Sequence, residues 1–299
     1  MQDLSGQDLA GPDLAGFAPA KVNLTLHILG RRADGYHELE SLVVFADAGD
    51  RLTFTPGGAL ALEVGGPTSQ AAGAAGDNLV LKAARALAGR VANLKVGRFG
   101  LDKQLPVAAG LGGGSSDAAA ALRLLAHHNG LPPDDARLYA AARATGADVP
   151  VCLDPRARMM RGIGDILSEP MRLPKLPAVL INPGVAVPTG EVFAALAAPA
   201  LPGAAQPDDF FKIDADAASL VAVLQARRND LEIPAIRLQP VIADVLESLR
   251  ACPGCLLVRM SGSGATCFGL FGSVGSADEA ANRMQAAQPG WWVRATSLS

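Results

Sequence analysis

The sequence is poor in charged residues, and lysine is especially scarce. Of its 299 residues, 18% are charged and 49% are hydrophobic, whereas an average globular domain has about 25% charged residues. This balance excludes a disordered chain, which combines high charge with low hydrophobicity. Only six of the 26 basic residues are lysines, and the formal net charge is −3. No basic cluster is visible that could neutralise phosphates, so we expect no nucleic-acid partner.

Cysteines and long apolar runs are also few. Of the four cysteines, only Cys252 and Cys255 form a C-x-x-C pair. A structural zinc site needs two further ligands, and no second pair is present, so reduced thiols packed as small apolar groups are the preferred interpretation. No apolar run reaches the about 18 residues of a membrane span, and the N-terminus lacks the features of a signal peptide. We therefore expect a cytoplasmic protein with no membrane partner.

The dipeptide Gly-Lys never occurs, and no three glycines have the spacing G-x-G-x-x-G. These absences exclude P-loop NTPases and ordinary dinucleotide-binding folds. Glycine itself is abundant, with 33 residues, but it has no three-residue period, which excludes collagen. What is informative is its position, because four of the five residues from Gly110 to Gly114 are glycine.

This glycine-rich segment runs Leu105-Pro-Val-Ala-Ala-Gly110-Leu-Gly-Gly-Gly114-Ser-Ser116-Asp117. A helix is predicted directly after it, from Ser115 to about His128, with Ser115 or Ser116 as its N-cap. Glycines let backbone N–H groups approach a ligand, and the N-terminus of a helix attracts anions. The segment therefore predicts a phosphate-binding loop, and the alternative is a flexible loop that merely leads into a helix.

The remaining pattern predicts groups of strands with helices between them. Strands are expected at 17–30, 38–46, 51–56, 94–101, 178–182, 255–260, 266–271 and 291–297, and helices at 78–90, 134–144, 189–197, 213–227, 238–250 and 277–287. Because a strict βαβ alternation is missing, the pattern favours α+β layers in two lobes over a doubly wound sheet. Residues 1–14 repeat Asp-Leu-(Ser/Ala)-Gly and are predicted to be a flexible tail.

Three further segments hold candidate functional residues. Ser261-Gly-Ser-Gly264 lies between two predicted strands, where it allows either a tight hairpin or the close approach of a neighbouring loop. Lys21 and Asn23 share one face of a strand. Lys21 needs an anionic partner if it is buried, and the alternative is an exposed edge position. Asp148 stands among apolar residues as a helix N-cap, a turn residue or a functional carboxylate.

These four segments, taken together, resemble a known group of kinases. Pro19-Ala-Lys21-Val-Asn23, the loop 106–116 and Ser261-Gly-Ser-Gly264 resemble the motifs of the galactokinase–homoserine kinase–mevalonate kinase–phosphomevalonate kinase (GHMP) superfamily. The resemblance spans residues 19 to about 271. It implies an α+β, two-lobed GHMP kinase fold with the active site in the cleft between the lobes. The N-terminal ATP-binding lobe would cover residues 15–160 and the C-terminal substrate-binding lobe residues 161–299.

One family within the superfamily is more similar than the others. Two segments carry this similarity to the family of 4-diphosphocytidyl-2-C-methyl-D-erythritol kinases: Gly30-Arg-Arg-Ala-Asp-Gly-Tyr-His37-Glu-Leu-Glu-Ser-Leu42 and Gly146-Ala-Asp148-Val-Pro-Val151. This resemblance implies ATP-dependent phosphorylation of that substrate at its 2-hydroxyl, in the non-mevalonate route to isoprenoids. Another small-alcohol kinase of the superfamily, or a non-catalytic nucleotide sensor, remains as an alternative. The partner would be a small molecule with a cytidine diphosphate moiety, and the chain a monomer or weak homodimer.

The resemblance also implies roles for individual residues. Asp148 would accept the proton of the attacking hydroxyl, and Lys21 would orient Asp148 and steady the transferring phosphoryl group. Mg²⁺ would arrive with ATP, without metal ligands from the protein. The family often has glycine where Ala108 and Ala109 stand in this sequence. The implied nucleotide contacts are Lys103, Pro106, Val107, Ala108, Ala109, Gly110, Leu111, Gly112, Gly113, Gly114, Ser115 and Ser116, and the implied substrate contacts are Asn23, Tyr36, His37, Thr189 and Phe193.

Overall fold

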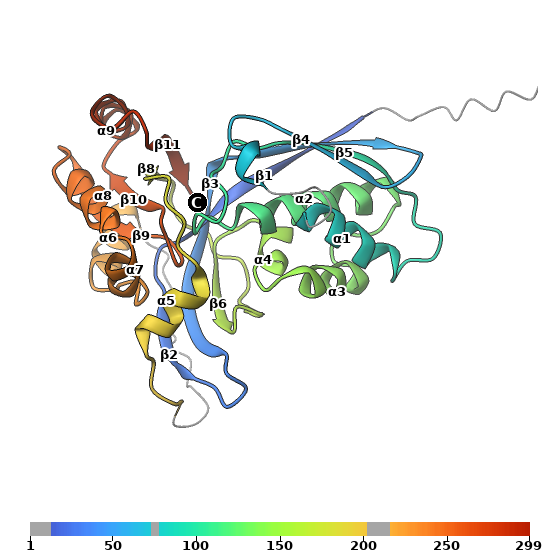
Figure 1. Cartoon of the computed structure of the whole chain (residues 1–299), viewed down its shortest axis with the longest axis horizontal. Helices are drawn as coiled ribbons and strands as arrows, with labels where there is room; N and C mark the ends of the chain where they lie inside the picture. Colours follow the sequence, from blue (N-terminus) through green and yellow to red (C-terminus); the bar gives the residue numbers. More distant parts are fainter. Residues whose placement is uncertain (1–12, 73–77, 202–215) are drawn as a thin grey trace, which may run out of the picture. The chain divides into compact units, whose positions relative to one another are not determined.

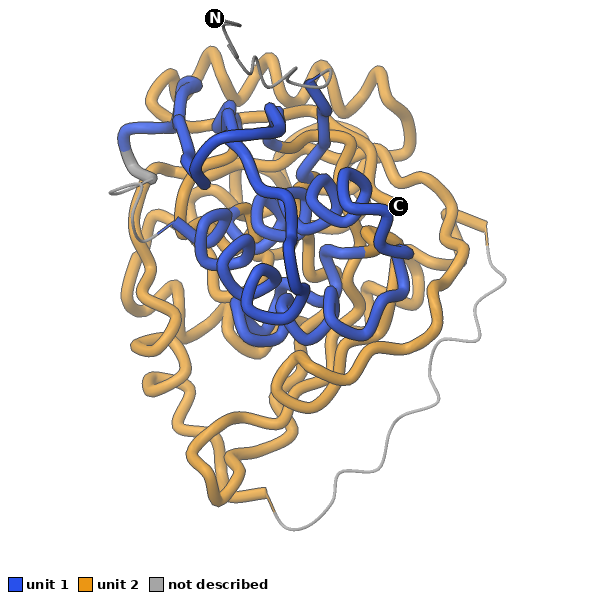
Figure 2. Tube along the Cα trace, turned by 90° about the vertical axis from the view of Figure 1, so that its right-hand side faces the viewer, with its two compact units in different colours: residues 1–18, 50–104, 114–153 blue, residues 19–49, 105–113, 154–299 orange. Residues whose placement is uncertain are grey.

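The computed structural model describes residues 13–72, 78–201 and 216–299 (Figure 1). The chain forms two compact units, each assembled from three stretches of sequence (Figure 2). Unit 1 comprises residues 1–18, 50–104 and 114–153, and unit 2 comprises residues 19–49, 105–113 and 154–299. These units are defined by compactness and not by ligand binding. The ATP-binding lobe 15–160 and the substrate-binding lobe 161–299 therefore stay a prediction.

Unit 1 contains a small sheet formed by β4 (Ala61–Gly65), β5 (Gly97–Asp102) and the second half of β3 (His37–Pro56). β5 runs parallel to β4 and antiparallel to β3. The side chains alternate as in a half-buried strand, because Leu52 and Phe54 are buried whereas Arg51 is exposed. Phe54 lies opposite Phe99 in the register, and their rings are 4.9 Å apart. One face of this sheet therefore carries the core of the unit.

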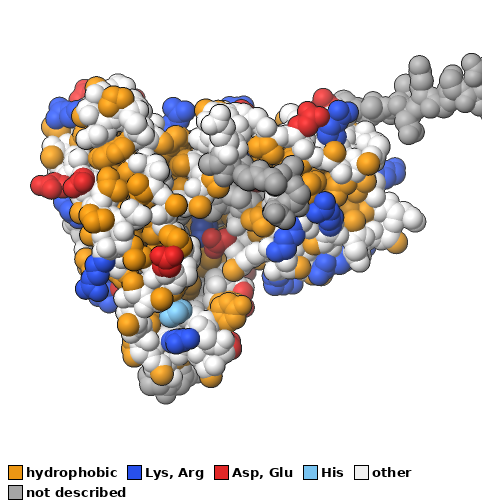
Figure 3. Space-filling view, viewed as in Figure 1, with side chains coloured by type: hydrophobic (Ala, Val, Ile, Leu, Met, Phe, Trp, Pro, Cys, Tyr) orange, Lys and Arg blue, Asp and Glu red, His pale blue; other side chains and the backbone are white. Residues whose placement is uncertain are grey.

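Helices cover that face of the sheet (Figure 1). They are α1 (Leu79–Ala88), α2 (Gly113–His128), α3 (Ala136–Thr145) and α4 (Val149–Leu153), with a 3₁₀ turn at Ser69–Ala72. Asn78 caps α1 by accepting a hydrogen bond from the Val80 N–H group at 2.9 Å. Lys and Arg side chains gather over α1 and α3 on the face shown in Figure 3, while the apolar sides of both helices are buried. Both helices are thus amphipathic.

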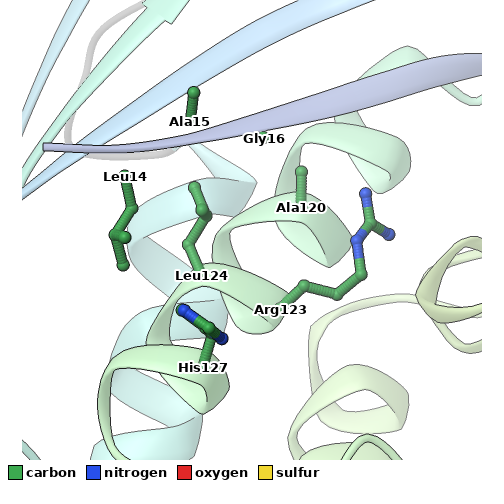
Figure 4. A pocket seen from close by; sticks show the side chains of 7 residues that line it. All are labelled: Leu14, Ala15, Gly16, Ala120, Arg123, Leu124 and His127. Carbon is green, nitrogen blue, oxygen red and sulfur yellow. The ribbon is translucent and has the colours of Figure 1, made fainter.

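Strand β1 (Leu14–Asn23) crosses α2 closely within unit 1 (Figure 4). A Cβ atom at Gly16 would lie 3.2 Å from Leu124 Cδ1, so the absence of a side chain permits this approach. From α2, the Arg123 guanidinium donates hydrogen bonds to the carbonyl oxygens of Phe17 and Cys152, both at 2.6 Å. These bonds tie α2 to β1 on one side and to α4 on the other.

Unit 2 is built on a second group of strands, in the order β3–β11–β8–β10–β9. β8 lies between β10 and β11 and is antiparallel to both. The first half of β3 also pairs with β2 and with β6, which in turn pairs with β7. The bounds of these strands are β2 His27–Arg31, β6 Arg158–Gly162, β7 Ile166–Leu167, β8 Leu176–Asn182, β9 Cys255–Met260, β10 Cys267–Phe271 and β11 Trp292–Leu298.

Both faces of the central strands in unit 2 are covered. Leu180 and Phe268 belong to one buried apolar cluster, whereas the adjacent Ile181 and Cys267 belong to another. This division follows from the two-residue period of a strand. α6 packs in the first cluster, and α8 and α9 pack in the second. The helices of the unit are α5 Thr189–Leu196, α6 Ala217–Gln225, α7 Glu232–Leu238, α8 Val241–Arg250 and α9 Val274–Ala287.

The structure corrects several local expectations. The single strand expected over residues 17–30 is two strands, since β1 ends at Asn23 and β2 begins at His27. Between them, the Leu24 N–H group donates to Leu42 O and the Leu26 N–H group donates to Arg228 O. α4, α7 and β6 were not predicted. Of the flexible tail expected at 1–14, residues 1–12 lie outside the described residues. However, Asp13 accepts a hydrogen bond from Thr55 and β1 begins one residue later, so both residues are part of the fold.

The expected N-cap of α2 is wrong as well. The helix begins at Gly113, so Ser115 and Ser116 lie inside its first turn. The helix starts earlier because Gly112 has a φ of +59°, which glycine adopts without strain, and the chain can turn into the helix there. Of the helices in the described residues, none is both long and apolar enough to cross a membrane.

Candidate active site

In unit 2, the glycine-rich loop (residues 105–113) packs against the serine–glycine loop (Ser261–Gly264). The Thr266 N–H group donates to Ala109 O at 3.1 Å, and Ser261 Oγ donates to Gly110 O at 2.9 Å. The serine–glycine loop also connects the antiparallel strands β9 and β10. Both interpretations of this segment are therefore correct, since it is a hairpin turn and also lies against a neighbouring loop.

Glycine is required where the two loops meet. Gly110 has a φ of +75°, and a Cβ atom there would lie 2.4 Å from Ser261 O and 2.9 Å from Gly264 O. Two residues earlier, Ala108 has a φ of +51°, a left-handed conformation that costs an L-residue about 1–2 kcal/mol. The methyl group of Ala108 thus stands at a position whose backbone conformation suits glycine.

Lys21 lies beside the glycine-rich loop. Its N–H group donates to Leu111 O at 2.8 Å, and a Cβ atom at Gly112 would approach the Lys21 side chain to 3.1 Å. Lys21 is only 4% exposed, which excludes the alternative of an exposed edge lysine. The protein thus places a buried cationic side chain against a loop of glycines, and this arrangement is suited to an anionic group.

Asn23 is held by both neighbouring segments of unit 2. Its N–H group donates to Ser261 Oγ at 3.1 Å, and its Nδ2 atom donates to Ser41 Oγ at 2.7 Å. Ser41 in turn donates to Thr25 O, so its hydroxyl can only accept from Asn23. This fixes the amide orientation. Among the described residues nothing donates to Asn23 Oδ1, which is buried, so it offers an acceptor to a donor group of a ligand.

A further residue holds the serine–glycine loop, and sequence reasoning missed it. Asn229 is buried, and its Nδ2 atom donates to Met260 O and to Gly262 O, both at 2.8 Å. Its Oδ1 atom accepts from the Leu231 N–H group at 2.9 Å. Asn229 lies more than 30 residues from the loop, and no local signal marks it. Ser41 beside Asn23 lies in the segment 30–42 that carries the family resemblance, but its role in orienting Asn23 was not predicted.

The residues expected on the substrate side belong to unit 2. Two of them contact each other, and a third contacts the serine–glycine loop. The rings of His37 and Phe193 are 4.7 Å apart and inclined by 32°. Thr189 Oγ1 and Ser263 Oγ are hydrogen-bonded at 2.9 Å. Tyr36 is 60% exposed. Burial and the nearby Arg31 charge lower the pKa of His37 below its ordinary value of 6.5, so the imidazole is neutral at neutral pH.

Two further predicted site residues, Asp148 and Lys103, belong to unit 1. Asp148 is half-buried in the turn between α3 and α4, directly before the wholly buried α4. The Lys103 ammonium is buried and donates to Asp50 Oδ2 at 2.5 Å and to Asp117 Oδ2 at 2.8 Å. Sequence reasoning did not single out either of these carboxylates. Among the described residues no group of three His, Cys, Asp or Glu side chains is placed to hold a metal ion.

Comparison with known proteins agrees with this geometry. The family description "GHMP kinases N terminal domain" matches residues 78–154, and "GHMP kinases C terminal" matches residues 214–290. The chain is 59% identical over 286 residues to a protein of Methylorubrum extorquens (strain PA1) named 4-diphosphocytidyl-2-C-methyl-D-erythritol kinase, with 94% of this chain and 98% of that protein covered. The chain belongs to this kinase family. A protein of the same name from Xanthobacter autotrophicus is 60% identical, with 94% and 97% covered.

Solved structures support membership of the family and the α+β GHMP fold. A crystal structure of 4-(cytidine 5'-diphospho)-2C-methyl-D-erythritol kinase has a TM-score of 0.76 and 36% identity, with 96% of this chain and 99% of that one covered. Homoserine kinase from Cytophaga hutchinsonii has a TM-score of 0.69 at 19% identity, with 98% and 97% covered. This second likeness shows the fold alone, and the fold agrees with the α+β class expected from the sequence.

Proposed function

We propose that this member of the kinase family phosphorylates the 2-hydroxyl of 4-diphosphocytidyl-2-C-methyl-D-erythritol with ATP. The observation that supports the proposal is the buried Lys21 side chain against the glycine-rich loop, because the two together would form a cradle for phosphate groups. The names of relatives at 59% and 60% identity support the choice of substrate. Residues 106–116 would hold the phosphates of ATP, with backbone N–H groups as donors.

In the proposed reaction, Asp148 accepts the proton of the substrate hydroxyl while that oxygen attacks the γ-phosphorus atom of ATP. A new P–O bond forms as the bond to the ADP oxygen breaks. Lys21 orients Asp148 and stabilises the negative charge on the transferring phosphoryl group, and its ammonium acts most strongly in a buried, low-dielectric site. Mg²⁺ enters with ATP, bound mainly through the phosphates.

We assign the substrate to the surface of unit 2 that carries Asn23, Tyr36, His37, Thr189 and Phe193. The unpaired Asn23 Oδ1 atom suits a substrate hydroxyl. The exposed ring of Tyr36 and the ring of Phe193 suit stacking on a cytosine base, and His37, whose ring contacts Phe193, suits hydrogen bonds to the edge of that base. The Thr189 and Ser263 hydroxyls suit polar groups of the diphosphate or the erythritol.

We further propose that residues 15–160 act as the ATP-binding lobe and residues 161–299 as the substrate-binding lobe. A cytoplasmic location suits the four cysteines, which are all free thiols. We expect a monomer or weak homodimer that binds neither nucleic acid nor membranes.

The decisive test of the function measures ADP release with four acceptor substrates. We expect turnover with 4-diphosphocytidyl-2-C-methyl-D-erythritol and none with mevalonate, homoserine or galactose. Turnover only with one of these three would assign the chain to another small-alcohol kinase. ATP binding without turnover on any acceptor would favour the nucleotide sensor.

The lowered pKa of His37 predicts a pH-dependent substrate KM. Above that pKa the neutral imidazole offers one acceptor and one donor nitrogen, and below it both nitrogens are donors. We expect the KM of the wild-type enzyme for the cytidine substrate to rise as the pH falls through this lowered pKa, whereas His37→Gln has a higher KM that stays flat over the same range. Steady-state kinetics between pH 5 and pH 8 check this. A variant KM with the wild-type pH profile would refute the assignment.

A further inference from the structure

Three charged side chains form a buried cluster inside unit 1. The Lys103 ammonium contacts the carboxylates of Asp50 and Asp117, and the three side chains are between 0% and 4% exposed. Replacing a buried ion pair by apolar residues often leaves stability unchanged or higher. Such a cluster is therefore weak evidence for a role in stability. Its position in the sequence, on both sides of the glycine-rich loop, indicates a different role.

The cluster brackets the glycine-rich loop. Lys103 lies two residues before the loop begins at Leu105, and Asp117 lies four residues after it ends, in the second turn of α2. Asp50 also accepts a hydrogen bond from the Gln104 N–H group at 2.6 Å through its other oxygen. Asp50 therefore contacts both Lys103 and Gln104 at the entrance of the loop. The Lys103 ammonium group also contacts Asp117 at the exit of the loop, so it links the two ends.

The backbone of Lys103 is fixed as well. Its N–H group donates to Gly65 O at 2.8 Å, and its carbonyl accepts from the Thr68 N–H group at 3.3 Å. At Gly66, a Cβ atom would lie 2.6 Å from Lys103 N, so the chain packs tightly there. The entrance of the loop thus has little freedom to move relative to the end of β5.

The two carboxylates keep the Lys103 ammonium charged. Burial alone would lower the pKa of Lys103, but the Asp117 and Asp50 carboxylates raise it above its ordinary value, so the ammonium keeps its proton. Burial raises the pKa of Asp117 to about 7, against the pull of Lys103. Among the described residues Asp117 Oδ1 has no donor. Two of the three N–H bonds of Lys103 are committed to carboxylates, and little of its charge is left for a phosphate.

We propose that Lys103 is a positioning residue, which joins Asp50 and Asp117 to fix the two ends of the glycine-rich loop and so pre-forms the phosphate cradle. The ammonium then acts through the loop and makes no contact of its own with the nucleotide. The inference rests on the proposed function, because it takes the loop to bind ATP. Its physical basis is preorganisation, since a loop whose ends are already fixed loses less conformational entropy on binding.

Isosteric variants of the two carboxylates test this proposal. Asp117→Asn and Asp50→Asn each remove one carboxyl group and keep the shape of the side chain. We expect each to raise the KM for ATP about tenfold to a hundredfold, as displaced binding groups do, while kcat and the KM for the cytidine substrate stay unchanged. Lys103→Met should have a similar effect, and Lys103→Met combined with Asp117→Asn should cost less than the product of the single effects.

Arg98→Gln is the matched control, because it breaks the exposed Arg98–Glu63 pair on the neighbouring strands β5 and β4. It should leave the KM for ATP unchanged. The proposal would be overturned if Lys103→Met raised the KM for ATP while Asp50→Asn and Asp117→Asn left it unchanged, since that result indicates direct contact of Lys103 with the nucleotide. Lower unfolding midpoints with an unchanged KM would also overturn it. Failure of the wild-type protein to bind ATP would instead refute the proposed function, so calorimetric titration of the wild type comes first.

Discussion

Asp148→Asn is expected to lower kcat by about a hundredfold to ten-thousandfold, the usual contribution of a general base, while ATP still binds. The substitution keeps the size of the side chain but removes its capacity to take a proton at neutral pH. The attacking hydroxyl then has to lose its proton to water. Single-turnover kinetics with saturating ATP measure the loss in the chemical step, and calorimetric titration with ATP measures whether binding survives.

The control for this variant is Asp134→Asn, an exposed aspartate in the same unit. It should leave kcat unchanged. Asp148 directly precedes the buried α4. The unfolding midpoints of both variants are therefore compared, to separate an effect on the helix from an effect on catalysis. A near-normal kcat for Asp148→Asn would remove this residue as the base. A low kcat together with a much lower unfolding midpoint would assign Asp148 to the capping of α4 instead.

The parts of the site that the sequence predicted depend on local conformation. The glycines from Gly110 to Gly114 are needed for positive φ angles and close approach, and these needs are visible in the sequence itself. Lys21 and Asn23 were marked by their two-residue spacing on a strand. The α+β class followed from the grouping of strands and helices, and structural neighbours confirm it.

The missing parts depend on contacts between distant segments. Asn229 holds a loop 31 to 33 residues away, and Ser41 orients Asn23 across 18 residues. Asp50 reaches Lys103 across 53 residues. These polar side chains carry no local pattern, and their roles follow only from tertiary packing. The start of α2 was wrong for a different reason, because the preference of serine for the N-cap competed with the freedom of three successive glycines, and the glycines prevailed.

Position 110 requires glycine both for its backbone conformation and for close approach, and Gly110→Ala is expected to impair both folding and ATP binding. The new methyl group would meet backbone atoms of the serine–glycine loop at 2.4 Å, 2.9 Å and 3.0 Å. Backbone atoms cannot swing aside as the end of a flexible side chain can, so the two loops must separate. We expect a loss of about 2–4 kcal/mol in the free energy of unfolding, from overpacking together with the strain of a positive φ.

Gly130→Ala separates these two contributions. Gly130 has a φ of +64°, close to the +75° of Gly110, but a Cβ atom there meets nothing within 4 Å. This control should therefore show the strain alone, about 1–2 kcal/mol, with normal affinity for ATP. Denaturant unfolding gives the stabilities, and calorimetric titration should show ATP binding weakened at least tenfold only in Gly110→Ala. Since the clash lies between the two loops, equal behaviour of the two variants would mean that their contact has no part in forming the phosphate cradle.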